Sequence, residues 1–513
     1  MRSPLAQAGH DGHPQNVAAN LVRTAEVHGE RPAVRSGQVS MTYHELDEAS
    51  ARTCTVLRSH GVAPGDRVGI MLPNVIEFAV TYFGALRAGA VVVPMNPLLK
   101  RREVGYYLSD SQARLLLAWH VVADEARAGA GRAGTGVIVI DPADSGTLAA
   151  AAPATGLAER SPGDTAVILY TSGTTGAPKG AELTHANLTA NADVVRRDLF
   201  RLGPDDVVLG ALPLFHSFGQ VCCLNAPVSA GASVSLIQRF DAAQVLRVMA
   251  EDKVTIFPGV PTMHVALLSQ PDLAEHDLSA LRVCMSGGAA MPAEVIRRVE
   301  RAFGAPVLEG YGLSETSPAA SFNHPDRVRK PGSVGTPIRG VQMRIVDDNG
   351  AEVPHGQTGE IVIRGHNVMK GYWRRPEETS AAIRDGWFRT GDIGRVDQDG
   401  YVYIVDRKKD LIIRGGYNVY PREIEEVLYE HPAVAEAAVV AIPHPELGQE
   451  VAAAVVLKPG AHVTPEELRD HVKTQVAAYK YPRVVWITDA LPKGPSGKIV
   501  KREIEVPPSV LRR

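Results

Sequence analysis

The sequence predicts an α/β protein: a large N-terminal domain of helix-covered sheets that includes a small β-barrel subdomain, and a small α+β C-terminal domain. Strand and helix signals alternate over the first three-fifths of the 513 residues. Short strands separated by turns follow from about Gly332, and helices return after Arg407, where lysine also becomes more frequent. We therefore place the N-terminal domain at 1–406, with its β-rich subdomain at about 332–406, and the C-terminal domain at 407–513.

The first region alternates apolar strands with capped helices. Thr42 and Glu45 form a capping-box pattern at the start of a helix. The apolar strand Val68–Met71 follows, and Asn74 is predicted to cap a helix that ends at Arg87. Further strands are predicted at Ala90–Pro94, Ala166–Tyr170, Val207–Leu212, Ser233–Ile237, Thr255–Phe257, Val283–Ser286 and Val307–Glu309, and helices at Asp241–Glu251 and Pro292–Phe303. This alternation indicates parallel sheets covered by helices.

The later regions are organised differently. Short strands are predicted at Val341–Val346, Glu360–Arg364 and Tyr401–Val405, with Asn-Gly and Asp-Gly turn signals between them. Two C-terminal helices are predicted at Pro421–His431 and Thr464–Lys473. The Ala/Gly/Pro-rich stretch 123–163 is predicted to hold a surface loop.

Composition excludes several classes of protein. A net charge of −3 and an aromatic content of 5% argue against a nucleic-acid binder. The four cysteines, with no C-x-x-C pair, exclude a zinc ribbon and a disulfide framework. Val207–Gln238 contains no charged residue, but Pro213, His216 and Gly231 interrupt it, so we interpret it as buried core lining a site rather than as a membrane helix. We expect a soluble, cytoplasmic protein.

A segment rich in glycine and hydroxyl groups follows the predicted strand Ala166–Tyr170. Its glycines let the backbone approach a phosphate, its hydroxyls can donate to phosphate oxygens, and its lysine supplies a positive charge. It is not a Walker A loop, because Pro178 stands between Gly176 and Lys179. The candidate phosphate-binding residues are Thr171, Ser172, Gly173, Thr174, Thr175, Gly176 and Lys179.

This segment and six further motifs, in the same order along the chain, resemble the AMP-forming acyl/aryl adenylate superfamily. The further motifs are PLFHSFG (213–219), SGGA (286–289), EGYGLSE (309–315), WFRTGD (387–392), DRKKD (406–410) and PKGPSGK (492–498). The resemblance covers almost the whole chain. It implies that ATP activates a carboxylic acid as acyl-AMP with release of pyrophosphate, and that a thiol, that of CoA in a CoA ligase, then accepts the acyl group.

The resemblance assigns roles to individual residues. Lys498 is expected to reach the α-phosphate and the substrate carboxylate, and Glu315, with Thr171, to hold Mg²⁺. Tyr311 is expected to stack on adenine, and Asp392 and Arg407 to bind the ribose hydroxyls. The remaining nucleotide-binding candidates are Gly288, Ala289, Glu309, Gly310, Gly312 and Ser314.

The resemblance also implies a mobile C-terminal domain. Lys409 occupies the hinge position, about which this domain rotates between the two half-reactions. The rotation would carry Lys498 away from the acyl-AMP and bring the Gly415–Gly416 loop to it as a passage for the arm of CoA.

We expect small, apolar residues to line the acyl pocket, and such a lining suits an alkyl chain. Its candidate residues are His216, which is also a catalytic candidate, and Phe218, Gly219, Val260, Gly287 and Gly312. No carboxylate lies in the motif around His216, which argues against an α-amino acid. The sequence looks most like bacterial medium- or long-chain fatty-acid CoA ligases, and cinnamate-like aryl acids stay open.

Three other functional readings stay open. A stand-alone adenylating enzyme would load a carrier-protein pantetheine instead of CoA. A luciferase-like oxygenase would depend on oxygen, and a regulatory nucleotide-binding protein would lack catalysis. The expected partners are small molecules. We expect neither a nucleic-acid partner nor a membrane-spanning segment. Both a monomer and a homodimer are compatible with the sequence.

Overall fold

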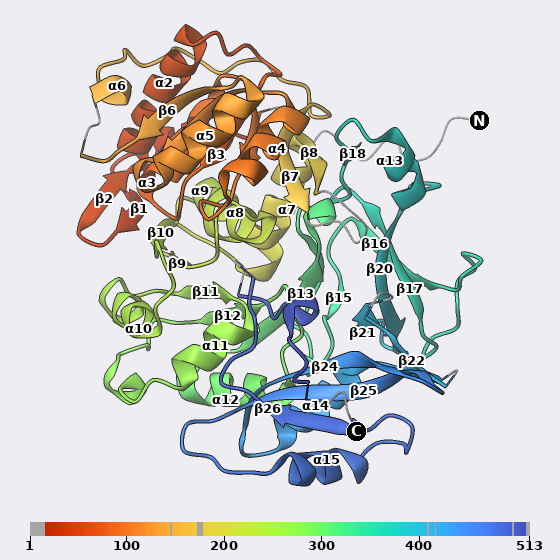
Figure 1. Cartoon of the computed structure of the whole chain (residues 1–513). Helices are drawn as coiled ribbons and strands as arrows, with labels where there is room; N and C mark the ends of the chain where they lie inside the picture. Colours follow the sequence, from red (N-terminus) through yellow and green to blue (C-terminus); the bar gives the residue numbers. More distant parts are fainter. Residues whose placement is uncertain are drawn as a thin grey trace.

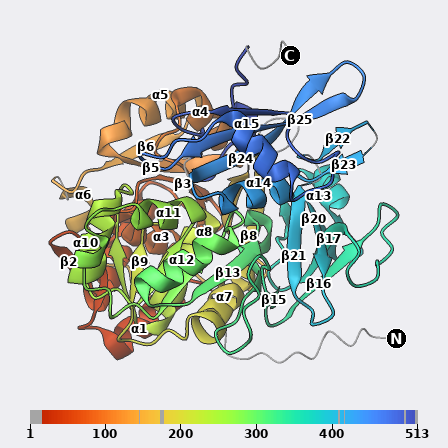
Figure 2. The same cartoon turned by 90° about the horizontal axis from the view of Figure 1, so that it is seen from below.

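Four β-sheets and the helices around them make up the described part of the chain (Figure 1). In this computed structural model the described residues are 16–143, 146–171, 178–407, 410–415, 417–494 and 497–508. The C-terminal elements, coloured blue in Figure 1, lie below the N-terminal sheets in that view, and Figure 2 shows the molecule from their side.

The two largest sheets are mostly parallel, as the alternation of strands and helices predicts. The nine-stranded sheet has the order β15 (Thr336–Pro337), β14 (Ala319–Phe322), β13 (Val307–Gly312), β12 (Val283–Ser286), β11 (Ile256–Gly259), β9 (Val207–Gly210), β10 (Ser233–Leu236), β1 (Pro32–Ser36) and β2 (Val39–Thr42). The seven-stranded sheet has the order β18 (Gly371–Tyr372), β8 (Lys179–Thr184), β7 (Thr165–Thr171), β4 (Val91–Pro94), β3 (Arg67–Met71), β5 (Ala113–Trp119) and β6 (Gly136–Ile140). The parallel pairs in the first sheet run from β1 through β10, β9, β11 and β12 to β13.

The main helices cover these sheets. They are α1 (Ala19–His28), α2 (Tyr43–Ser59), α3 (Ile76–Arg87), α4 (Arg101–Ser111), α5 (Ala123–Ala133), α7 (His185–Val194), α10 (Ala242–Glu251), α11 (Pro261–Leu268) and α12 (Ala293–Phe303), with the short helices α6 (Gly146–Ala149), α8 (Ser217–Gln220) and α9 (Ala226–Ala230). The capping box of Thr42 and Glu45 is confirmed at the start of α2. The cap predicted at Asn74 is wrong, because its side chain bonds to backbone groups of residues 210–214 instead and fastens the segment after β9.

The β-rich region forms a five-stranded antiparallel sheet. Its path is β16 (Val341–Val346), β17 (Gly359–Gly365), β20 (Trp387–Val396) and β19 (Ile383–Arg384), and β21 (Val402–Arg407) pairs with β20; α13 (Pro376–Ala382) lies between β18 and β19 in the chain. The three strands predicted here from the sequence correspond to β16, β17 and β21.

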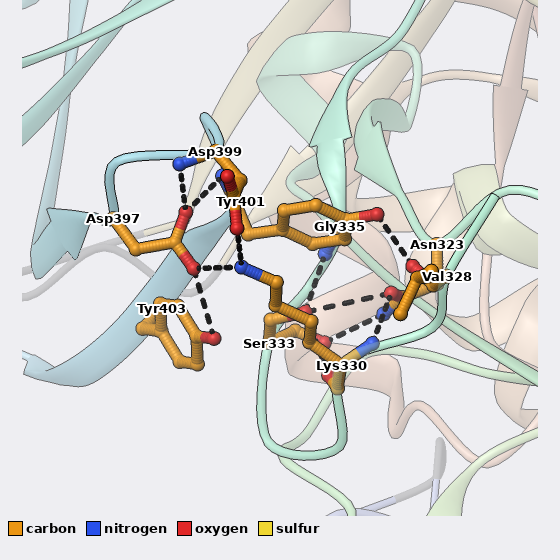
Figure 3. A network of polar contacts seen from close by, with 9 residues as sticks. All are labelled: Asn323, Val328, Lys330, Ser333, Gly335, Asp397, Asp399, Tyr401 and Tyr403. Atoms are coloured by element: carbon orange, nitrogen blue, oxygen red, sulfur yellow. Dashed lines mark hydrogen bonds and ion pairs between the residues drawn. The ribbon is translucent and has the colours of Figure 1, made fainter.

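A polar network ties the loop before β15 to the hairpin between β20 and β21 (Figure 3). The Lys330 ammonium donates to Asp397 and Asp399 at 2.6 Å each and lies 4.5 Å from the centroid of the Tyr401 ring. The Tyr403 hydroxyl donates to the Asp397 carboxylate at 3.3 Å. The network holds two chain segments about 70 residues apart against each other.

The C-terminal elements form their own sheet and core. The sheet contains β23 (Tyr417–Val419), β22 (Ile412–Arg414), β25 (Gly448–Leu457), β24 (Val434–His444) and β26 (Val484–Ile487), with α14 (Pro421–Glu430) and α15 (Pro465–Lys473) beside it. Apolar side chains of these elements, such as Leu428, Val439 and Leu468, pack in clusters separate from the main core. The domain boundary near residue 406 stays a prediction.

The surface loop predicted at 123–163 is wrong over its first half. Residues 123–133 form α5 and 136–140 form β6, while 150–164 contain no helix or strand. The small residues serve close packing: a Cβ added at Gly129 would lie 2.5 Å from a Val104 side-chain atom of α4. Alanine is also the best helix former, so the composition was compatible with α5.

The uncharged stretch Val207–Gln238 is buried core, as expected. It is divided among β9, α8, α9 and β10, and nearly all of it is buried. Among the described residues, no helix is both long and apolar enough to cross a membrane.

Candidate active site

A continuous cavity of about 1250 Å³ opens where several strands end and the C-terminal elements begin. Strands β9, β11, β12 and β13 run parallel, so their carboxyl ends share one edge of the sheet, where ligands of α/β proteins bind. Most of the predicted site residues lie on its wall. They are Thr171, Lys179, His216, Phe218, Gly219, Val260, Gly287, Gly288, Ala289, Gly310, Tyr311, Gly312, Ser314, Glu315, Asp392 and Lys498.

Other predicted site residues are placed elsewhere or are not described. Glu309 is buried behind the wall, with 2% of its surface exposed. Gly415 is exposed after β22, away from the described cavity wall, and its N–H donates to the Leu447 carbonyl at 3.0 Å. Ser172, Gly173, Thr174, Thr175, Gly176, Lys409 and Gly416, and the side chain of Arg407, lie outside the described residues.

Lys498 reaches the cavity from the C-terminal segment and lies against Gly288. A Cβ added at Gly288 would be 2.7 Å from Lys498 Cε and 3.2 Å from its Nζ. Gly288 has φ +80°, a backbone conformation that favours glycine. The Thr262 hydroxyl of α11 donates to the Gly497 carbonyl at 2.8 Å, which fastens the adjacent residue. A glycine is therefore needed where the lysine side chain crosses the wall.

His216 lies beside this lysine as a neutral imidazole. Burial and, to a smaller extent, the positive charge of Lys498 lower its pKa to about 4. The centroid of the Phe215 ring lies 4.8 Å from the centroid of the imidazole. Because His216 is uncharged at neutral pH, it can orient a carboxylate by hydrogen bonding but does not neutralise it.

Glu315 is the carboxylate on the wall beside β7 and β8. Its Oε1 accepts hydrogen bonds from the Thr171 hydroxyl at 3.3 Å and from the Tyr372 hydroxyl at 3.0 Å. The described residues contain no group of three or more His, Cys, Asp or Glu side chains able to hold a metal. Mg²⁺ is usually held by one or two carboxylates together with substrate phosphates, so a single glutamate next to a phosphate-binding segment fits this ion.

Tyr311 and Asp392 meet at another part of the wall. The Tyr311 hydroxyl donates to Asp392 Oδ2 at 2.6 Å, and Asp392 is 3% exposed. The preceding Gly391 has φ +71°, and its N–H donates to Glu360 Oε1 at 3.2 Å. Asp392 pairs in register with Arg407 across β20 and β21. An aromatic face and an oriented carboxylate suit a nucleoside, with the base on the ring and the vicinal hydroxyls on the carboxylate.

The buried Glu309 carboxyl lies next to this region. Its Oε1 accepts from the Met291 N–H at 2.9 Å, while its Oε2 has no hydrogen-bond partner among the described residues. Burial raises its pKa to about 7, although the positive charge of Arg422 opposes this. Glu309 therefore titrates near neutral pH in the folded protein.

Sequence reasoning did not predict three contacts that support the site, those made by Tyr372, Thr262 and Glu360. Tyr372 bonds to Glu315 across 57 residues, and Thr262 to Gly497 across 235. Such contacts follow from tertiary packing, so no local spacing could predict them. Glu360 lies on a predicted strand, but nothing in the strand pattern marks it as a partner of Gly391.

Comparison with known proteins identifies relatives of this chain by sequence and by structure. The model of the family described as AMP-binding enzyme matches residues 21–373, and that of the AMP-binding enzyme C-terminal domain matches residues 423–498. The chain is 37% identical to a long-chain-fatty-acid–CoA ligase of Bacillus subtilis (strain 168) over 501 residues, which cover 90% of this chain and 89% of that protein. It is 40% identical to a feruloyl-CoA synthase of Amycolatopsis sp. over 496 residues, which cover 96% and 98%.

A solved structure is similar over nearly the whole chain. ATP-bound MatB from Rhodopseudomonas palustris superposes with a TM-score of 0.90 at 36% sequence identity, and the match covers 95% of this chain and 97% of that one. The similarity thus extends through both the parallel sheets and the C-terminal elements.

Proposed function

The chain belongs to the AMP-binding enzyme family, and from this premise we propose that it is an AMP-forming acid–CoA ligase. It activates a carboxylic acid with ATP and Mg²⁺, releases pyrophosphate, and transfers the acyl group from acyl-AMP to CoA. The observation that carries the proposal is the position of Lys498 in the cavity that also contains Glu315, Tyr311 and Asp392.

In the first half-reaction the substrate carboxylate attacks the α-phosphate of ATP. Lys498 stabilises the negative charge that develops on the phosphoryl oxygens, and His216 orients the carboxylate as a neutral imidazole. Tyr311 stacks on the adenine, for which the small residue Ala289 leaves room. Glu315 with Thr171 would hold Mg²⁺, which would supply charge neutralisation at the phosphates.

The phosphate-binding segment at 171–179 and the ribose site complete the proposed nucleotide site. Asp392 and Arg407 bind the ribose hydroxyls. Glu309 supports the adenine site from behind the wall, since its backbone leads directly into Gly310 and Tyr311.

In the second half-reaction the CoA thiolate attacks the acyl carbonyl, and AMP leaves. The C-terminal domain, 407–513, rotates about Lys409, withdraws Lys498 and brings Gly415 and Gly416 to the acyl-AMP. The exposure of Gly415 away from the cavity fits the arrangement that precedes this rotation.

For the acid we propose a medium- or long-chain fatty acid. The part of the wall next to His216 includes Phe218, Cys222, Val260 and Met285 and no Asp, Glu, Arg or Lys between residues 212 and 222. An alkyl chain gains about 0.8 kcal/mol per buried CH₂ in such a pocket. The identity to a fatty-acid ligase supports this choice.

An aryl acid is the second candidate for the same pocket. The identity to a feruloyl-CoA synthase favours it, and a flat ring also fits an apolar slot lined by Phe218. A carrier-protein pantetheine is the alternative acceptor. The cytoplasmic location is a further part of the proposal.

Mass spectrometry of one reaction tests these choices. Purified protein is mixed with ATP, Mg²⁺, CoA and a panel of short, medium and long fatty acids and cinnamates. AMP with a fatty acyl-CoA series supports the proposal, and AMP with a cinnamoyl-CoA supports the aryl alternative. AMP or bound acyl-AMP without acyl-CoA indicates a carrier protein, and ADP in place of AMP refutes the mechanism. The Lys498→Ala variant is the control for a contaminating ligase.

A further inference from the structure

The phenol of Tyr372 contacts two charged residues of the cavity wall at once. Its hydroxyl donates to Glu315 Oε1 at 3.0 Å, and the Lys179 ammonium lies 5.3 Å from the centroid of its ring. All three residues line the cavity. Tyr372 therefore stands between the carboxylate and the ammonium that the proposed function assigns to metal and phosphate.

Glu315 contacts the hydroxyl of the tyrosine, and Lys179 contacts its ring. No ion pair within 4 Å joins Lys179 to Glu315 in the described part of the chain. The face of an aromatic ring attracts a cation, and a phenol hydroxyl is a good donor to a carboxylate. A tyrosine hydroxyl carries its proton at neutral pH and can therefore act as a donor.

The backbone around Tyr372 is fixed to the elements that carry both charges. Strand β18 pairs antiparallel with β8, with Tyr372 opposite Ala181, and Lys179 begins β8. The N–H of Met369 donates to the Glu315 carbonyl at 2.8 Å, and that of Trp373 donates to the Gly180 carbonyl at 2.7 Å. The segment is thus anchored on both sides of the phenol.

We propose that Tyr372 is a positioning residue for Mg²⁺–ATP: its hydroxyl orients Glu315 for the metal, and its ring holds Lys179 for the phosphates, apart from Glu315. This inference rests on the proposed function, because it assumes that metal and nucleotide bind in this cavity. Tyr372 acts through Glu315 and Lys179 and takes no part in bond making.

Two variants separate the two contacts. Tyr372→Phe removes the hydroxyl and keeps the ring, and Tyr372→Leu removes both. Mn²⁺ replaces Mg²⁺ as the probe, and its binding is followed by electron paramagnetic resonance. The nucleotide is α,β-methylene-ATP, which cannot be cleaved between its α- and β-phosphates. Binding of the nucleotide without metal is measured by calorimetry.

We expect Tyr372→Phe to raise the Mn²⁺ dissociation constant about 10-fold, as loss of a hydrogen bond to a charged group predicts. Its metal-free nucleotide affinity should match that of the wild type. Tyr372→Leu should in addition weaken metal-free nucleotide binding about 3-fold, as loss of a cation–π contact predicts. Tyr403→Phe is the matched control, because it removes a phenol hydroxyl bonded to Asp397 in the network of Figure 3, away from the described cavity wall, and should change neither constant.

Wild-type Mn²⁺ affinity in Tyr372→Phe would overturn the inference, as would equal losses of metal-free nucleotide binding in both variants. Should Tyr372→Leu prove unstable, Tyr372→Phe tests the metal contact by itself. The proposed function fails separately if no acid in the panel gives pyrophosphate while the binding differences persist. If the wild type bound no Mn²⁺–nucleotide, both proposals would fall.

Discussion

The hydroxyl of Thr262 donates a 2.8 Å hydrogen bond to the carbonyl of Gly497, and this bond joins the first turn of α11 to the loop that carries Lys498. Gly497 has φ +76°, and a Cβ there would lie 3.0 Å from the Thr262 hydroxyl. The close approach leaves Lys498 directed along Gly288 into the cavity. One contact between residues far apart in the sequence thus fastens the residue next to the proposed catalytic lysine.

Thr262→Val removes this bond and keeps the shape of the side chain. We expect the rate of pyrophosphate release to fall about 3- to 10-fold, which corresponds to the net free energy of one hydrogen bond. Formation of acyl-CoA from supplied acyl-AMP should stay at the wild-type rate, because the proposed rotation withdraws Lys498 in that step. Ser269→Ala is the control, since it removes an exposed hydrogen bond to Val265 at the other end of the same helix. Equal loss in both half-reactions would show that the bond serves only stability.

Gly288→Ala places a methyl group where Lys498 crosses the wall. The added Cβ would lie 2.7 Å from Lys498 Cε, so the side chain must move. Misplacement by about 1 Å can cost on the order of 100-fold in rate, and we expect pyrophosphate release to fall at least 10-fold. Gly304→Ala is a matched control, because Gly304 has a similar φ of +66° but nothing within 4 Å of its added Cβ. Comparable losses in the two variants would assign the effect to backbone strain.

Lys498→Ala removes the positive charge proposed to stabilise the phosphoryl oxygens. Loss of one such group costs about 10²- to 10³-fold, and we expect a loss of at least this size in pyrophosphate release. The thioester step from supplied acyl-AMP should continue. Lys253→Ala, which breaks an exposed ion pair with Asp277 away from the described cavity wall, is the control. If both half-reactions fail together in Lys498→Ala, the lysine is structural.

Sequence patterns predicted the elements whose residues act locally. Continuous apolar runs such as Val283–Ser286 became buried parallel strands, because such strands are covered on both faces. Asn74 shows the limit of this reasoning. The local sequence fits a helix cap, but the Asn74 side chain forms its hydrogen bonds with backbone groups of residues 210–214 instead. The Ala-rich α5 was missed because small residues predict both loops and tight helix packing.

The candidate site was predicted mainly by the resemblance of the ordered motifs to the adenylate-forming family, because the residues alone indicated a phosphate-binding segment but no role for Lys498 or Glu315. Lys179, Glu315 and Lys498 all line one cavity, although Lys179 begins β8 of the seven-stranded sheet, Glu315 follows β13 of the nine-stranded sheet, and Lys498 lies in the C-terminal segment. Tyr372 and Thr262 could not be predicted, since each acts on a partner brought near only by the fold. Their roles and those of the motif residues remain proposals for the experiments above.

Glu309 makes stability depend on pH in a defined direction. Burial raises its pKa to about 7 in the folded protein, against about 4.3 in an unfolded chain. Between these values the folded state keeps a proton that the unfolded state releases, so the stability from this group is complete below about pH 4.3 and is lost as the pH rises through 7. The glutamine in Glu309→Gln stays neutral at every pH. The decrease in the free energy of unfolding between pH 5 and 8 should therefore be about 3 kcal/mol smaller in the variant than in the wild type. Urea unfolding of the ligand-free wild type and variant across this range measures the difference, and effects of the buried histidines cancel because both proteins contain them. Parallel curves for the two proteins would show that the Glu309 carboxyl is ionised at neutral pH, contrary to the burial argument.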